Sequence, residues 1–330
     1  MNTPLLTVSG LNVDFTQGQG GTRVVEDVSF QVNSTSIVGV VGESGSGKSV
    51  TARAIAGILP GNGTSSGSVV FQDRELVNLS PRPARAARRG MSMIFQNPRM
   101  ALDPVFTIGS QLTETLRLKQ DLSRRSARSQ SAELLAAVGI PEPRRRLDDY
   151  PHMMSGGMAQ RVMIALSLAC SPDLLIADEP TSALDVSVQA QILELLKRLR
   201  DEIGTAIVFI SHDLGAVAEL CDDIVVMYNG HVVELGPAAE VIRSPRHPYT
   251  EGLLNAVPRL RDSPIGREEL PFNGIPITVT KSSLPSTGCN FAHRCRSAAD
   301  ECRTETVLRP VGPARETRCT RSEPIFSEAT

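Results

Sequence analysis

Short apolar runs alternate with amphipathic stretches along the chain, and this pattern predicts strands and helices in turn. Apolar or alternating runs predict strands at residues 5–8, 11–15, 28–32, 37–41, 67–71, 174–178 and 206–211. Apolar side chains at helical spacing predict helices over residues 49–59, 107–139 and 188–196. Because the helical segment 188–196 connects two apolar strands, those strands are expected to be parallel. The pattern therefore predicts an α/β fold.

The pattern changes towards the C-terminus. From about Ser244 onward proline becomes frequent and the periodicity fades, which predicts a small C-terminal extension. The chain has 330 residues, of which 41% are hydrophobic, enough for one large α/β domain and an appendage. The formal net charge of −2 favours neither nucleic acid nor an anionic membrane surface as a partner.

The sequence gives no sign of a membrane span. No segment approaches the roughly 18 consecutive apolar residues that a span requires. The N-terminal residues MNTPLLTVSG also lack a basic region followed by an apolar core. We therefore expect any membrane association to be peripheral. The basic segment 123–128 is interpreted as the solvated face of a helix, with binding of an anionic partner as the alternative.

A phosphate-binding pattern follows the apolar run 37–41. Residues 42–49 read GESGSGKS and match G-x-x-x-x-G-K-S/T. Glycines let backbone N–H groups turn towards a triphosphate, and the following helix directs its positive dipole end at the same anion. In this pattern Lys48 reaches the β- and γ-phosphates and the Ser49 hydroxyl binds Mg²⁺. The predicted phosphate loop consists of Gly42, Glu43, Ser44, Gly45, Ser46, Gly47, Lys48 and Ser49.

Two adjacent carboxylates end the apolar strand at 174–178, within the segment LLIADEP. Ligands of open α/β sheets bind beyond the carboxyl ends of the strands. We expect Asp178 to hold Mg²⁺ through its water shell and Glu179 to polarise the water that attacks the γ-phosphate. An ordinary strand end followed by a helix cap would look similar. Together with the phosphate loop, however, the pair predicts hydrolysis of the nucleotide.

The segment SGGMAQR at 155–161 opens a mostly apolar helical pattern that runs to Leu168. Two glycines at the start of a helix offer backbone donors and the positive end of the helix dipole to an anion. The segment is therefore interpreted as a second phosphate-binding element, with a simple turn capped by Ser155 as the alternative.

The order of the motifs along the chain is also informative. Together with the phosphate loop, the chain contains FQ at 95–96, SGGMAQR, LLIADEP, SALD at 182–185 and SHD at 211–213. In this order the motifs resemble those of the nucleotide-binding subunits of ABC transporters. This resemblance covers about residues 5–255. It implies a P-loop NTPase domain with a RecA-like core, a β-subdomain and a helical subdomain at about 97–160, and it implies ATP and Mg²⁺ as cofactors. We place the ATPase domain at 1–255 and the extension at 256–330.

The resemblance also implies roles for single residues. Phe15 is similar to the aromatic residue that stacks on adenine, although a place in the strand core is the alternative. Gln96 resembles the glutamine that senses Mg²⁺ and the γ-phosphate, and His212 resembles the switch histidine that fixes the attacking water. With Lys48 and Glu179 they form the predicted catalytic set. The residues expected to act between subunits, on the nucleotide held by the partner, are Ser155, Gly156, Gly157 and Asp185.

Because the segment at 155–161 completes the partner's site in this family, two chains are expected to sandwich two nucleotides. Met158 stands where the common signature has glutamine, which changes side-chain contacts and leaves the backbone donors in place. ATP would draw the subunits together and hydrolysis would release them.

Longer strings narrow the resemblance to one group. Residues 96–109 and 244–250 are similar to importers of dipeptides, oligopeptides and nickel. Membership would imply three kinds of partner: a substrate-binding protein, two permease subunits, and a second and different ATPase subunit. It would also imply a place on the cytoplasmic face of the plasma membrane and no nucleic-acid partner. The alternatives are a nickel importer, a soluble ABC ATPase acting on nucleic acid or ribosomes, an exporter, and a regulatory module that holds ATP without turnover.

Four cysteines cluster in the extension, at Cys289, Cys295, Cys302 and Cys319, with gaps of five, six and sixteen residues. They suggest a staple for a lobe with little core of its own. The gaps lack the C-x-x-C pairs of zinc ribbons, so we favour a 4Fe-4S cluster over structural zinc, with simple thiols or disulfides as a further alternative. Cys170 and Cys221 are expected to be small buried apolar residues.

Overall fold

A computed structural model describes residues 3–17, 20–120, 122–182, 184–256 and 288–320 of the chain. The chain folds into two compact units. The helical unit comprises mainly Val32–Ser36 and Phe71–Ile210, and the P-loop unit comprises Leu6–Gln31, Ile37–Val70 and the residues from Ser211 onward. Among the described residues, no helix combines the length and apolar character needed to cross a bilayer.

The larger sheet of the P-loop unit, called the main sheet here, has five strands among the described residues. Side by side, its strands are β11 (Arg309–Gly312), β12 (Arg315–Thr317), β10 (His231–Pro237), β9 (Asp223–Tyr228) and β3 (Ile37–Val41). Strand β3 is parallel to β9, and the other pairs are antiparallel. All residues of β3 are buried, as the apolar run predicted. A side chain at Gly39 would come within 2.8 Å of Val217 in helix α9 (Leu214–Leu220), so this helix packs closely on the strand.

Strands β1 (Leu6–Gln17), β2 (Gly20–Val32) and β4 (Gly63–Phe71) form a second sheet in the same unit. The prediction of two separate strands at 5–8 and 11–15 was wrong, because β1 continues through Gly10. Gly10 has a φ of +56°, and a side chain at Gly67 would lie 2.2 Å from the Gly10 carbonyl oxygen. Glycine at both positions lets the two strands approach without ending either.

The predicted helix at 49–59 is shorter in the structure. Helix α1 runs over Lys48–Ala56 and ends at Gly57, which has a φ of +71°. The N–H groups of Gly57 and Ile58 donate to the carbonyls of Ala54 and Arg53, at 3.1 and 2.9 Å. This double contact around a left-handed glycine terminates a helix. The stop signal is therefore Gly57, and not the later proline and glycine at 60–61.

In the helical unit three parallel strands lie side by side in the order β8 (Ala206–Ser211), β7 (Leu174–Asp178) and β6 (Met91–Ile94). The structure thus confirms the predicted strands at 174–178 and 206–211 and their parallel direction. The connecting helix α8 spans Val186–Arg198, somewhat longer than the predicted 188–196. Buried apolar residues fill all of β7 except its final aspartate, which is itself buried.

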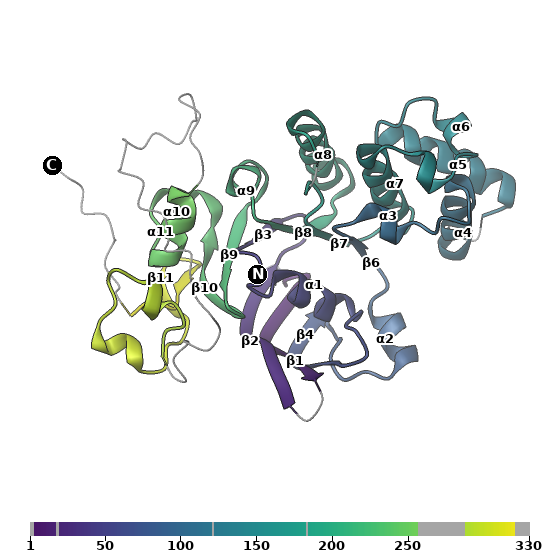
Figure 1. Cartoon of the computed structure of the whole chain (residues 1–330). Helices are drawn as coiled ribbons and strands as arrows, with labels where there is room; N and C mark the ends of the chain where they lie inside the picture. The colour runs from purple at the N-terminus through teal and green to yellow at the C-terminus, as the bar shows by residue number, and fades with distance from the viewer. Residues whose placement is uncertain (1–2, 18–19, 121, 183, 257–287, 321–330) are drawn as a thin grey trace. The chain divides into compact units, whose positions relative to one another are not determined.

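Helices make up the rest of this unit. Helix α4 (Ile108–Gln120) packs against α5 (Arg124–Ala137), and both contact α7 (Gly156–Leu168), as Figure 1 shows. This agrees with the amphipathic pattern at 107–139. Smaller helices are α2 (Pro81–Ala87), α3 (Pro98–Ala101) and α6 (Pro143–Arg146). The basic segment 123–128 caps and opens α5, and most of its residues are exposed, as expected of a solvated face.

The described part of the extension, residues 288–320, forms a small lobe that we call the cysteine lobe. It contains strands β11 and β12, which continue the main sheet, and the short turns Ala292–Arg294 and Asp300–Arg303. The lobe packs through Phe291, whose ring lies 5.3 Å from Tyr228 and 5.5 Å from Tyr249. The boundary predicted at 255/256 stays a prediction, since residues 257–287 lie outside the described residues.

Two helices precede the lobe, and the second of them lies where the sequence pattern faded. Helix α10 spans Ala238–Arg243 and α11 spans Pro248–Asn255. Pro248 occupies the first turn of α11, and the Nδ1 atom of His247 caps the helix by accepting from the Tyr249 N–H at 3.1 Å. Burial lowers the pKa of His247 to about 3, which keeps the imidazole neutral and able to accept.

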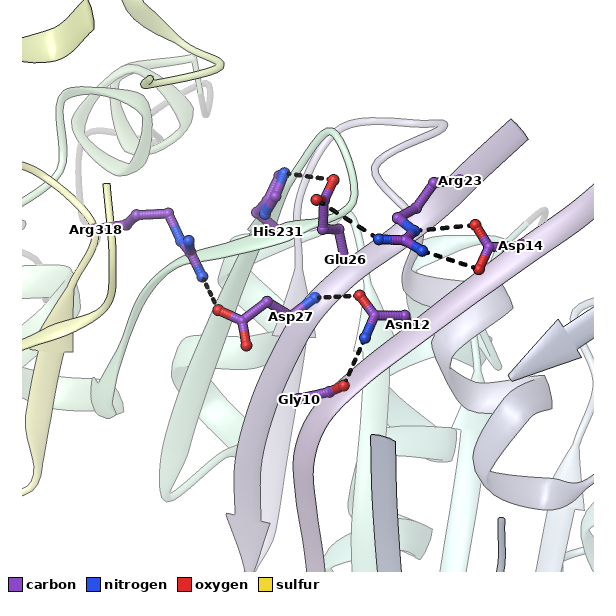
Figure 2. A network of polar contacts seen from close by, with 8 residues as sticks. All are labelled: Gly10, Asn12, Asp14, Arg23, Glu26, Asp27, His231 and Arg318. Carbon is purple, nitrogen blue, oxygen red and sulfur yellow. Dashed lines mark hydrogen bonds and ion pairs between the residues drawn. The ribbon is translucent and has the colours of Figure 1, made fainter. Parts of the chain in front are cut away.

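Polar contacts join the cysteine lobe to strands β1 and β2. Figure 2 shows Arg318 paired with Asp27 at 3.0 Å, while the Asp27 N–H donates to Asn12 Oδ1 at 3.1 Å. The Asn12 amide then donates to the Gly10 carbonyl at 2.8 Å. A second row of contacts beside it runs through His231, Glu26, Arg23 and Asp14. The lobe is therefore attached to the P-loop unit by polar contacts as well as by strand pairing.

Candidate functional site

The predicted phosphate loop lies between β3 and α1. Gly42 and Gly47 have φ values of +153° and +100°. A side chain at Gly42 would lie 2.1 Å from the Met227 carbonyl oxygen, and one at Gly47 would lie 3.2 Å from that of Val24. Both positions therefore need glycine. Since Gly47 caps α1 without a side chain, no cap side chain competes for the first-turn N–H groups. This backbone fits the binding of a phosphate chain.

Lys48 is buried inside this loop, with only 5% of its surface exposed. Its Nζ donates to the carbonyls of Gly42 and Glu43, at 2.8 and 2.9 Å. The ammonium is therefore held by the loop itself, next to the N-terminus of α1. Ser49 follows in the first helical turn and is half-buried. A hydroxyl oxygen at this position suits a hard cation such as Mg²⁺.

Phe15 and His212 are the other predicted site residues of the P-loop unit. Phe15 lies half-buried on β1, and its ring edge would come 2.8 Å from a side chain added at Gly63. His212 is exposed between β8 and α9. The neighbouring Asp213 caps α9 by accepting from the N–H groups of Gly215 and Ala216, at 2.8 and 3.3 Å. This cap orients the turn that carries His212, and the sequence reasoning did not foresee it.

The carboxylate pair lies at the end of β7 in the helical unit. Asp178 is 1% exposed, and Glu179 follows it with a φ of +47°. The Glu179 N–H donates to the Ile210 carbonyl at 3.0 Å, which holds this uncommon backbone conformation. Gln96, just beyond β6, donates from Nε2 to Glu179 Oε2 at 2.9 Å. The structure thus brings together two residues that are 83 positions apart in the sequence.

Helices α7 and α8 carry the residues predicted to act between subunits. Ser155 caps α7, because its hydroxyl accepts from the Met158 N–H at 3.3 Å. Gly156 is exposed, with open space where a side chain would stand. A side chain at Gly157 would lie 3.1 Å from Val188, so the N-termini of α7 and α8 are close neighbours.

Asp185 caps helix α8 and is exposed. Its carboxylate accepts from Ser187 Oγ at 2.6 Å and from the Val188 N–H at 2.9 Å. The hydrogen bond from Ser187, followed by that from Val188, lowers the pKa of Asp185. The carboxylate is therefore ionised at the N-terminus of a helix, where a negative charge is stabilising.

The four cysteines of the lobe line one small cavity of about 10 Å³, together with His247 and Phe291. Burial raises the pKa of the Cys289 thiol to about 11. None of the six cysteines forms a disulfide, so the structure does not support the disulfide alternative. Across the described residues, no three His, Cys, Asp or Glu side chains are grouped to hold a metal ion. Outside the lobe, Cys221 is buried as predicted, whereas Cys170 is only half-buried.

Sequence reasoning missed two residues that hold the phosphate loop. The Tyr249 hydroxyl accepts from the Glu43 N–H at 2.7 Å, and the Arg294 guanidinium donates to both Glu43 carboxylate oxygens. Both residues belong to segments without clear periodicity. Tyr249 lies within the string 244–250, and Arg294 lies next to Cys295 of the cysteine cluster. Neither pattern indicates a contact with Glu43.

Comparisons with known proteins identify the family of the chain. Residues 25–182 match the family model described as ABC transporter, and residues 233–302 match the one described as oligopeptide/dipeptide transporter, C-terminal region. The chain is 48% identical over 316 residues to the oligopeptide transport ATP-binding protein OppD of Salmonella typhimurium, covering 96% of this chain and 93% of that protein. It is 46% identical over 328 residues to the probable peptide ABC transporter ATP-binding protein y4tR of Sinorhizobium fredii, covering 98% and 96%.

Solved structures give the same result at lower identity. A dimeric structure of MJ0796, a bacterial ABC transporter cassette, aligns with a TM-score of 0.64 and 26% identity over 71% of this chain and 98% of that one. The structure of cbiO1 from Clostridium perfringens, part of the ABC transporter complex cbiONQ, aligns with a TM-score of 0.62 and 27% identity, over 72% and 90%. The chain belongs to the ABC transporter family and has the P-loop NTPase fold. It is an ATPase, and its C-terminal region is of the oligopeptide/dipeptide transporter type.

Proposed function

We propose that this chain binds and hydrolyses ATP to power the import of dipeptides or oligopeptides through an ABC transporter. The observation that carries the proposal is similarity over nearly the whole chain to ATP-binding proteins named for peptide transport, C-terminal region included. Neither nickel import nor a soluble ABC ATPase is favoured by these relatives. A module that holds ATP without turnover is disfavoured because Glu179 and His212 are both present.

The P-loop unit supplies the residues for nucleotide binding in this proposal. Backbone N–H groups of the loop and of the first turn of α1 bind the phosphates, and Lys48 neutralises the charge of the β- and γ-phosphates. Ser49 is a ligand of Mg²⁺, and Phe15 stacks on the adenine ring. The loop glycines and the buried ammonium support the phosphate-binding roles.

The helical unit supplies the residues for hydrolysis. Bound MgATP would offer a γ-phosphorus that water attacks, while the bond from that phosphorus to the departing ADP breaks. Asp178 holds the Mg²⁺ water shell, and Glu179 accepts a proton from the attacking water. The 2.9 Å hydrogen bond from Gln96 orients the Glu179 carboxylate, and the Gln96 amide oxygen remains available to the cation. His212, from the turn before α9, contacts the γ-phosphate.

The proposal requires a dimer of ATPase subunits, with a second and different subunit as the partner. Ser155, Gly156 and Gly157 would bind the nucleotide held by that partner, and Asp185 would lie in the loop that crosses between subunits. The exposure of Ser155 and Gly156 at the start of α7 supports this role. We further propose two permease subunits and a substrate-binding protein as partners, and a peripheral place on the cytoplasmic face of the membrane.

Capture of the assembly tests this function. Tagged chain carrying Glu179→Gln, with ATP and Mg²⁺, should recover two permeases and a second ATPase subunit from detergent-solubilised native membranes. The same complex made with the unaltered chain should hydrolyse ATP faster when its binding protein is loaded with a short peptide. Mass spectrometry and phosphate release are the measurements, and capture in ADP is the control.

Two outcomes would contradict the proposal. Recovery of ribosomal or DNA-repair proteins without a membrane subunit would remove the transport assignment. Stimulation of the ATPase by nickel, with no response to peptides, would reassign the cargo.

We also propose that the four cysteines of the lobe bind a 4Fe-4S cluster. The four cysteines line one cavity, and four thiolates are the ligands that such a cluster uses, although no three of the cysteines are grouped to hold a metal ion in the described residues. A cavity of about 10 Å³ holds roughly one water molecule, so the proposal requires the thiols to move apart on binding. The raised pKa of Cys289 adds the requirement that the metal displaces the thiol proton.

Iron and sulfide assays on anaerobically purified protein test the cluster. We expect about four irons per chain by this ligand count, and their loss when Cys295 and Cys302 are both replaced by serine. Cys170→Ser, outside the lobe, should keep the full metal content. Zinc at one per chain, or no metal in any preparation, would exclude the cluster.

A further inference from the structure

Glu43, the second residue of the phosphate loop, is held through three separate groups. Its N–H donates to the Tyr249 hydroxyl at 2.7 Å, and its carbonyl accepts from Lys48 Nζ at 2.9 Å. Its carboxylate accepts from both terminal nitrogens of Arg294, each at 2.9 Å. One of these contacts lies within the loop, and the other two come from α11 and the cysteine lobe.

The contact with Arg294 is stronger than an ordinary surface ion pair. Its two parallel hydrogen bonds match the guanidinium fork to the carboxylate, a geometry that lysine cannot reproduce. The Arg294 side chain is 9% exposed and Glu43 is 39% exposed, so the pair is partly shielded from water. The guanidinium also lies 5.7 Å from the Tyr228 ring centre and 5.9 Å from that of Phe291. These rings restrict where the arginine can point.

Phe291 is close to both residues that contact Glu43 from outside the loop. Phe291 precedes the turn Ala292–Arg294, and its ring packs at 5.5 Å against Tyr249, whose hydroxyl binds Glu43. The turn itself lies between Cys289 and Cys295, which line the cysteine cavity. The folding of the cysteine lobe therefore places Arg294 at the loop and packs Phe291 against Tyr249.

We propose that Arg294 is a positioning residue that links the cysteine lobe to the nucleotide site. It restrains Glu43 and, through the Glu43 carbonyl, the ammonium of Lys48. The loop is then ordered before nucleotide binds, and less ordering remains to oppose binding. Nucleotide affinity consequently depends on the fold of a lobe that contains no nucleotide-binding motif.

The lobe should stay folded when Arg294 is changed. Arg318 still joins it to Asp27 (Figure 2), Arg315 still pairs with Glu234 at 2.7 Å, and β12 still pairs with β10. A loss of affinity in such a variant then reports on the loop and not on unfolding of the lobe.

Nucleotide titrations of the full-length chain test the proposal. Arg294→Gln should raise both the Kd for the slowly hydrolysed probe ATPγS with Mg²⁺ and the KM for ATP by about tenfold. The value of kcat should stay within about twofold, because saturating nucleotide orders the loop by itself. The Kd of Arg294→Lys should lie between those of the unaltered chain and Arg294→Gln, since lysine keeps the positive charge but cannot form the two parallel hydrogen bonds. Arg303→Gln is the matched control, because Arg303 belongs to the same lobe and is 83% exposed.

A double variant separates positioning from simple stability. Glu43→Gln should raise the Kd as Arg294→Gln does. Combining the two changes should raise the Kd little further, since both remove the same contact. Fully additive effects would overturn the proposal. So would a variant with a lower unfolding temperature and an unchanged Kd, because that result assigns Arg294 a purely structural role.

Discussion

Replacing Glu179 with glutamine should slow ATP hydrolysis by about 100-fold or more, the contribution expected of a general base. The amide has nearly the shape of the carboxylate and can still accept the hydrogen bond that Gln96 donates at 2.9 Å. It cannot accept a proton from water. Nucleotide affinity should change little, because the phosphate loop is unaltered, and ATP-bound dimers should accumulate. Phosphate release, ATPγS titration and size-exclusion chromatography measure the three effects.

Glu194→Gln provides the matched control for this prediction. Glu194 is exposed on helix α8, so the same chemical change there should leave turnover as it is. Unaltered turnover in Glu179→Gln would remove Glu179 as the base. A comparable loss in both variants would point to a general effect of charge on the helical unit.

Local patterns predicted the elements that carry the nucleotide motifs. The phosphate loop needs glycine at positions 42 and 47 because both have a positive φ, and at position 42 a carbonyl oxygen also leaves no room for a side chain. Such a requirement fixes the spacing of the glycines in the sequence, so the loop can be predicted without a structure. Asp178 was equally predictable, because a buried apolar strand leads directly to it. Both features depend on residues within a few positions of one another.

Two helix caps could have been predicted from the sequence but were not. Asp185 and Asp213 each precede a helix and accept from its first N–H groups. Aspartate before a helical pattern is a known start signal. Our interpretation gave Asp185 only a role between subunits and gave Asp213 none. The two interpretations of Asp185 are compatible, since the cap fixes the position at which the loop ends and α8 begins.

Contacts across long sequence distances could not be predicted. Arg294 and Glu43 are 251 positions apart, and Gln96 and Glu179 are 83 apart. Nothing in the local pattern around Arg294 indicates its partner, because the extension has little periodicity. Strand β12 is only three residues long and pairs with β10 over two of them. Its place in the sheet depends on contacts made after the chain has folded.

The buried pair of Arg315 and Glu234 should carry much of the attachment of the cysteine lobe. Arg315 is 5% exposed and Glu234 is fully buried, and they lie 2.7 Å apart. Glu234 also accepts from the N–H groups of Arg246 and His247, at 2.8 and 2.9 Å. Arg315 donates further to the Ser244 carbonyl. One ion pair thus joins β12, β10 and the segment that leads into α11.

Arg315→Met should therefore destabilise the P-loop unit by about 3 to 5 kcal/mol, because it leaves a buried carboxylate without its counter-charge. The unfolding midpoint should fall by about 6 °C or more. Adding Glu234→Gln should recover part of the loss, since it removes the unpaired charge and keeps one acceptor. Arg145→Met removes an exposed pair with Glu142, where both side chains are at least 60% exposed, and should leave the midpoint unchanged. If Arg315→Met melts like the unaltered chain, strand pairing and the aromatic contacts hold the lobe without this pair.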